Sequence, residues 1–244
     1  MRVDTIAVRL RPRTPMEAAD LGTRLCQSAA RDVYLCTCLA AIPVALLAAA
    51  SAELASWLPT LVIWWLKPWL DRSILFVLSR AAFGQRTSPA DLWRNQRQVW
   101  WSQLLHTLTQ RRLSPWRSLT QPVYQLEGVR LLRAGTRVGQ IRRRKVGSAL
   151  LVTFGYAFVE QCLVIALLSL AFWFAPEGET PLTLDLLTGV LPAFVAVATP
   201  IALGVVVLFL EPFYVAAGFG IYLNRRAELE AWDIEQEFRR AFAS

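Results

Sequence analysis

The sequence predicts an all-α integral membrane protein with about four transmembrane helices, arranged as two hairpins, and with cytoplasmic amphipathic interfacial helices. Of its 244 residues, 55% are hydrophobic and only 18% are charged, which is too apolar for an ordinary soluble domain. Residues 33–50, 146–175 and 186–210 form apolar stretches close to or above the length of about 20 residues that a helix needs to cross a bilayer. These stretches do not alternate apolar and polar side chains as barrel strands do, so helices are expected.

The first region, residues 1–32, is expected to be a cytoplasmic amphipathic helix. Thr14 and Glu17 form a capping-box pattern with Pro15 at the first helical position, which predicts a helix start. Apolar residues then recur near one face (Ala18, Leu21, Leu25, Ala29 and Val33). This face is expected to lie on the inner membrane surface; the alternative is a plain extension of the first span. The early arginines are not followed by an apolar core, so no cleavable signal is expected.

The two transmembrane hairpins are expected over residues 33–83 and 147–222. Their spans are predicted near residues 33–52, 56–83, 147–174 and 186–222. The second and fourth spans exceed one straight crossing, and the fourth would extend about 55 Å as a single helix. Pro212 offers a break in it. The sequence leaves open whether these two segments are single helices, kinked or re-entrant.

Arginines set the expected orientation in a bacterial inner (cytoplasmic) membrane. The loop of residues 84–146 carries twelve Arg and one Lys against Asp91 and Glu127, a balance of +11. By the positive-inside rule this loop is cytoplasmic. The arginine-rich N-terminus and the C-terminal helix of residues 223–244 are expected on the same side. Residues 51–56 and 175–185 lack Lys and Arg and are expected outside.

A second capping pattern at Ser88 and Pro89 predicts an interfacial helix within the basic loop. Five residues of this helix are expected to contact lipid headgroups: Trp93, Arg94, Arg97, Trp100 and Trp101. A basic, aromatic stretch is also typical of nucleic-acid binding, but Trp and Arg on an amphipathic helix of a membrane protein favour lipid. No nucleic-acid partner is expected. The residues 121–128 predict a turn after this helix.

Two similar four-residue motifs interrupt the apolar segments: Leu66-Lys67-Pro68-Trp69 and Leu210-Glu211-Pro212-Phe213. Each has a leucine, a charged residue, a proline and an aromatic residue in that order. Charges are costly in lipid and usually mark a partner or a function. Lys67, Glu160 and Glu211 are therefore the candidate intramembrane site. They are expected to form a charge pair that locks the hairpins, to line a polar path for an ion, proton or substrate, or to snorkel to the interface.

Nothing in the sequence indicates an enzyme, a cofactor or a metal site. His106 is the single histidine, and the four cysteines show no CxxC spacing. Cys36 and Cys38 would point to nearly opposite sides of a helix, so they cannot clamp a metal together.

The tail of residues 222–235, preceded by Glu211-Pro212-Phe213, resembles the membrane domain attached to some glycerophosphodiester phosphodiesterases. Three further motifs are similar to an uncharacterised Gram-negative family of multi-span membrane proteins: residues 11–22, residues 64–68 and residues 125–128. Genes of that family often neighbour those of a MoxR-type ATPase and of von Willebrand A-like, stage II sporulation M-like and RDD proteins. The resemblance implies other membrane proteins and a MoxR-type ATPase system as partners. It implies no phosphodiesterase activity, because the catalytic domain is absent.

The C-terminal helix is the expected docking surface for a partner. Four residues are singled out: Arg226 and Glu230, spaced to pair along a helix, and Trp232 and Phe238. The function expected from all these features is a non-enzymatic inner-membrane scaffold, or a subunit of a larger envelope-associated membrane complex. The alternative is a permease-like or lipid-handling protein that uses Lys67, Glu160 and Glu211.

Overall fold

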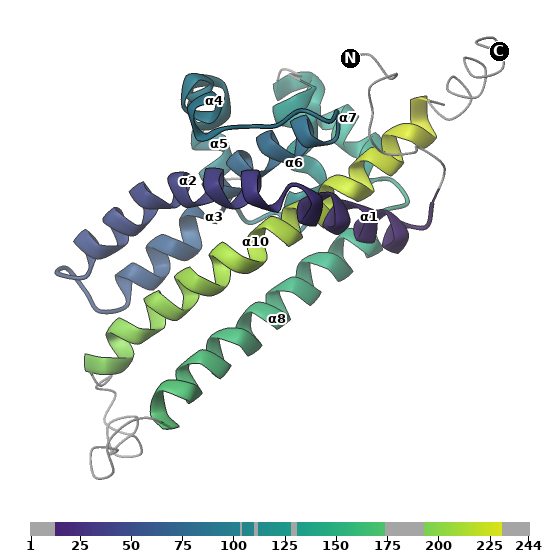
Figure 1. The fold of residues 1–244 in the computed structure, drawn as a ribbon. Coiled ribbons are helices and arrows are strands. Elements are labelled where there is room, and N and C mark those ends of the chain that lie inside the picture. The colour runs from purple at the N-terminus through teal and green to yellow at the C-terminus, as the bar shows by residue number, and fades with distance from the viewer. Residues whose placement is uncertain (1–12, 103, 110–111, 128–130, 174–192, 231–244) are drawn as a thin grey trace.

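The computed structural model describes residues 13–102, 104–109, 112–127, 131–173 and 193–230 (Figure 1). Within these residues every regular element is a helix and none is a strand, so the all-α class predicted from the sequence is confirmed. Four helices are long: α2 (Ala30–Ser51), α3 (Leu58–Ala81), α8 (Val146–Trp173) and α10 (Ala193–Glu230). The tail that contains Trp232 and Phe238, and the expected outer loop of residues 175–185, lie beyond the described residues.

Three of the described helices are long and apolar enough to cross a membrane: Ala30–Ser51, Val146–Leu170 and Val195–Leu229. The fourth expected span, α3, is not among them. Its middle carries Lys67, Asp71 and Arg72, and charged side chains lower the hydropathy of a span steeply. The structure therefore supports a helical membrane protein, whereas the count of four spans is not confirmed.

Helix α10 is the element around which the others pack. It contacts α1 (Pro15–Ser28), α2, α3, α6 (Arg117–Leu126) and α8, and Figure 1 shows it running through the middle of the bundle. It stays helical through Pro200 and Pro212 over 38 residues, about 57 Å at 1.5 Å per residue. The last predicted span was expected to be a single helix, a kinked helix or a re-entrant segment. Over the described residues it is one continuous helix.

The N-terminal helix α1 packs against α10 instead of standing apart on a surface. Thr14 and Glu17 form the predicted capping box. Its buried residues are all small: Ala18, Ala19, Gly22 and Cys26. A Cβ added to Gly22 would lie 2.0 Å from the carbonyl oxygen of Ala216, so the two backbones touch. Small residues permit such close helix packing.

The basic loop is broken into short helices, which gather at one end of the bundle (Figure 1). They are α4 (Pro89–Arg94), η2 (Arg97–Trp101), α5 (Leu104–Leu108), α6 and α7 (Leu131–Arg142). The single helix expected after Pro89 is interrupted because buried Arg72 of α3 donates to the carbonyls of Gln98 and Val99. A regular α-helix would use both carbonyls internally.

The turn predicted over residues 121–128 is wrong for its first part, because Gln121 to Leu126 belong to α6. Pro122 lies inside this helix and is buried. The side chain of Gln125 donates to the carbonyl of Arg72 at 2.8 Å. Packing against α3 therefore outweighs the local turn preference of the sequence.

Candidate functional site

Four helices bring ionisable side chains together in the interior. Lys67 and Asp71 lie one turn apart on α3, Glu160 lies on α8, Glu211 on α10, and Arg117 opens α6. Residues four apart share one face of a helix, which explains why Lys67 and Asp71 reach the same cluster. The spacing of Thr153, Ala157, Glu160 and Val164 likewise puts them on one face of α8.

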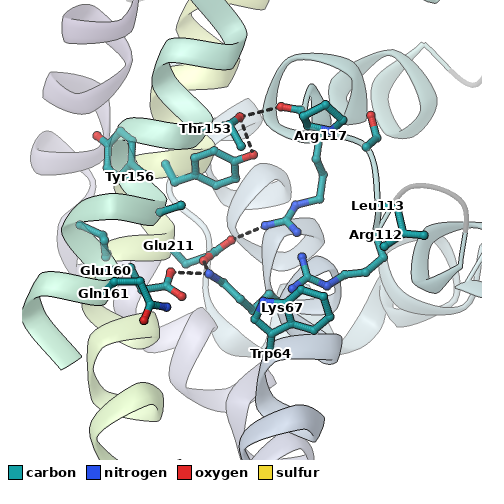
Figure 2. Close-up of a pocket in the computed structure, with 15 residues that line it drawn as sticks. Trp64, Lys67, Arg112, Leu113, Arg117, Thr153, Tyr156, Glu160, Gln161 and Glu211 are labelled. Carbon is teal, nitrogen blue, oxygen red and sulfur yellow. Dashed lines mark hydrogen bonds and ion pairs between the residues drawn. The ribbon is translucent and has the colours of Figure 1, made fainter. Parts of the chain in front are cut away.

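The five charges alternate in sign along a chain of contacts, the ion-pair chain, and Figure 2 shows all of them except Asp71. Lys67 Nζ contacts Glu160 Oε2 and lies 2.8 Å from Glu211 Oε2. Arg117 lies 2.7 Å from the other oxygen of Glu211 through Nη2, and 2.7 Å from Asp71 Oδ2 through Nε. The order is thus Glu160, Lys67, Glu211, Arg117 and Asp71. Of the three roles weighed for the candidate residues, this geometry matches paired burial and not snorkelling.

Every member of the ion-pair chain is buried, with side-chain exposures of 9% or less. Burial alone would lower the pKa of Arg117, but the charges of the nearby carboxylates, Asp71 and then Glu211, outweigh it and raise the pKa above its usual value. Removing one partner from such a pair leaves an uncompensated buried charge, which costs about 3–5 kcal/mol.

Helix α8 also fixes the segment that leads into α6. The hydroxyl of Thr153 donates to the carbonyl of Pro115 at 2.7 Å and lies 3.2 Å from the hydroxyl of Tyr214. These contacts hold the start of α6, and with it Arg117, against α8 and α10.

A cavity of about 240 Å³ lies beside the ion-pair chain. Its wall includes Trp64 and Lys67 of α3, Arg112 and Arg117, and Glu160 and Gln161 of α8 (Figure 2). The guanidinium of Arg112 lies over the Trp64 ring, 3.6 Å from the ring centroid. Burial, and then the charge of Arg117, lower the pKa of Arg112 to about 10. The cavity thus has charged walls of both signs.

The residues expected at the lipid interface divide into two groups. Trp93, Arg94, Arg97 and Trp101 are exposed. Trp100 is only 5% exposed; it stacks on Trp69 at 5.3 Å between ring centroids and donates from Nε1 to Ser73 at 2.8 Å. Trp100 therefore contacts the protein interior, where a buried indole N–H needs a partner.

The expected docking residues of the C-terminal helix are only partly described. Arg226 turns towards Glu127, with 3.9 Å between Nε and Oε1, and its side chain is 14% exposed. Glu127 also accepts a hydrogen bond from Tyr222 at 2.8 Å. Glu230 ends α10, and Trp232 and Phe238 lie outside the described residues.

Sequence reasoning missed Asp71, Arg112 and Arg117. Asp71 carried a signal, because it follows Lys67 by four residues within the same predicted span. The two arginines carried none, since they sit among twelve in a basic loop that the positive-inside rule already explains.

In the part of the chain that the structure describes, no three His, Cys, Asp or Glu side chains are grouped to hold a metal ion. Comparison of the chain with protein-family models, with curated proteins and with solved structures finds no match.

Proposed function

We propose that the protein is a non-enzymatic scaffold in the inner membrane, or a subunit of a larger envelope-associated complex. The observation that supports this role is the ion-pair chain, in which each carboxylate contacts a cation and each cation contacts two carboxylates. A transport or catalytic group must change its partner or its protonation state during a cycle. Here separation of Glu160 from Lys67, or of Asp71 from Arg117, would leave a buried carboxylate unpaired, which is strongly unfavourable.

The surface proposed for a partner lies on the short helices of the basic loop and on the segment between α5 and α6. Four large apolar side chains there are exposed: Trp93 by 57%, Trp101 by 59%, Leu105 by 79% and Leu113 by 73%. Exposed apolar groups gathered in one region favour contact with another protein or with lipid. The family resemblance suggests other membrane proteins and a MoxR-type ATPase system as the partners.

Affinity purification of the full chain from native membranes in mild detergent, followed by mass spectrometry, tests this role. We expect specific partners to be recovered with the parent protein and lost with Leu105→Glu. Leu54→Glu is the matched control, because Leu54 has the same exposure of 79% but lies in the α2–α3 turn. Recovery of a lone protein at full yield would contradict the scaffold role.

The second candidate is a permease-like or lipid-handling protein, and the cavity beside Lys67, Glu160 and Glu211 favours it. A polar path predicts that Glu160→Gln changes a transport or binding activity at unchanged protein level. If Glu160→Gln and Lys67→Met change only the amount of folded protein, the path is excluded and the scaffold role is supported.

A further inference from the structure

Arg112 is a cation for which the described part of the chain supplies no counter-ion. Among the described residues it forms no ion pair, and its buried Nε has no hydrogen-bond partner. The carboxylates nearest in the cluster are already held by Lys67 and Arg117. A buried guanidinium N–H without a partner carries the cost of its desolvation, so an acceptor placed in the cavity would be stabilised there.

The α8 side of the cavity offers the opposite charge. Lys67 uses only Oε2 of Glu160, and Oε1 accepts no hydrogen bond from the described residues. Gln161, the next residue, also lines the cavity. In Figure 2 Glu160 and Gln161 lie on one side of Lys67 and Arg112 on the other. The cavity can therefore receive an acceptor at one end and a donor at the other.

The charge balance decides which ligand class fits. The lining holds three cations, Lys67, Arg112 and Arg117, and two carboxylates, Glu160 and Glu211. Asp71 contacts Arg117 from outside the lining and, in its ionised form, brings the formal charge of the whole cluster to zero. A ligand with no net charge preserves this balance, whereas an anion would leave the buried cluster with an excess negative charge.

An apolar groove continues from the cavity along the same helices. It encloses about 460 Å³ and shares Trp64 and Gln161 with the cavity. The rest of its lining is Trp57, Thr60, Leu61, Val164, Thr199 and Leu203. From Trp64 to Trp57 it follows two turns of α3, about 10 Å. The two spaces together fall within the range of roughly 300–1,000 Å³ that is typical of small-molecule sites.

We propose that the cavity and the groove together bind a zwitterionic glycerophospholipid of the phosphatidylethanolamine class. Its phosphate pairs with Arg112, its ammonium group donates to Glu160 and Gln161, and one acyl chain lies in the groove between α3, α8 and α10. This inference rests on the lipid-handling form of the second candidate function. It does not depend on the scaffold role, which the recovery of protein partners tests separately.

Native mass spectrometry of the detergent-solubilised full chain tests the headgroup. We expect added phosphatidylethanolamine to bind, and Arg112→Gln to weaken this binding about tenfold. Arg143→Gln is the control, because it removes the same charge from an exposed arginine outside the cavity and should leave binding within about twofold. Equal binding by both variants would overturn the assignment. Thermal melting of Arg112→Gln, expected to match the parent, shows that the loss is not one of folding.

The groove is tested by filling it. Leu61→Trp, in the groove lining, should reduce phosphatidylethanolamine binding, whereas Leu46→Trp, on the exposed face of α2, should not. Two results would overturn the zwitterionic lipid as occupant. One is phosphatidylglycerol binding as tightly as phosphatidylethanolamine. The other is inorganic phosphate displacing the lipid as effectively as a second lipid does.

Discussion

Glu211 is contacted by two cations, Lys67 and Arg117, one at each carboxylate oxygen. At the scale of single residues this sharing explains how five charges are tolerated in an apolar interior. Each cation also touches a second carboxylate, so only the two end groups, Glu160 and Asp71, depend on a single contact. Attraction between such charges is strong because little water screens it.

The Lys67→Met variant should lose about 3–5 kcal/mol of stability, since two buried carboxylates, Glu160 and Glu211, would lose a partner. Thermal unfolding in detergent, followed by circular dichroism, measures the loss. Arg24→Met is the matched control, because the Arg24–Asp20 pair is exposed (73% and 59%) and such pairs contribute about 0–1 kcal/mol. Equal melting temperatures for the two variants would contradict a stabilising role of the ion-pair chain.

We expect the stability of the first turn of α4 to depend on pH through Asp91. Its carboxylate accepts hydrogen bonds from the backbone N–H and the hydroxyl of Ser88, which hold its pKa below the usual value. The contribution to helix stability is therefore fully present above the unfolded pKa of about 4, and is lost as the pH falls through the lower folded pKa.

Hydrogen exchange of the peptide of residues 88–94, relative to Asp91→Asn at each pH, measures this contribution. We expect amide exchange to be slower in the parent than in the variant at neutral pH, and this difference to disappear in acid. A difference that persists at the lowest pH would show that the capping box is not the titrating element.

At the scale of elements, the long helices were the predictable part of the fold. The predicted spans 33–52, 56–83 and 147–174 match α2, α3 and α8 to within three residues at each end, because long apolar runs are a local signal. The break at η2 was not predictable, since it depends on Arg72, some 26 residues earlier in the chain. The pairing of Lys67 with Glu211 was predictable from the two similar motifs, which carry opposite charges. In contrast, nothing in the sequence distinguished Arg117 from the other arginines of the loop.

The contact between α1 and α10 leads to a prediction at two glycines. Gly22→Ala should destabilise the protein by about 1–3 kcal/mol, because its Cβ would meet the Ala216 carbonyl oxygen at 2.0 Å. In contrast, Gly155→Ala on α8 has no neighbouring atom within 4 Å and should stabilise its helix by about 0.5–1 kcal/mol. Chemical denaturation in detergent compares the two, and a neutral Gly22→Ala would mean that the helices are further apart than described.

At the scale of the whole molecule, the bundle combines three apolar helices with one, α3, whose three central charges are covered by its neighbours. Lys67, Asp71 and Arg72 are at most 7% exposed. Mean hydropathy is a poor guide to whether α3 can lie in a membrane, because it counts every charged side chain as if it faced lipid without a partner. Once the charges are paired inside the bundle, what α3 shows to its surroundings is apolar, including Leu61, Trp64 and Trp65.

The predicted orientation can be tested with single cysteines. Leu54→Cys, in the α2–α3 turn, should react with a membrane-impermeant maleimide in intact spheroplasts. Arg143→Cys, after α7, should react only once the membrane is opened. Reactivity above that of the parent is measured, because the parent has two exposed cysteines, Cys38 and Cys162. Reaction of Arg143→Cys in intact spheroplasts would reverse the assignment.

The ion-pair chain also constrains how the protein is made. Glu160 follows Lys67 by 93 residues, and Glu211 comes later still. At roughly 5–20 residues per second, Lys67 leaves the ribosome roughly 5–20 s before its first counter-charge. During that time α3 carries unpaired charges and is poorly suited to enter lipid by itself. The stable packing of α3 therefore has to wait for α8 and α10, so a chain that stops before α8 would hold an unfinished helix that cellular quality-control machinery can recognise.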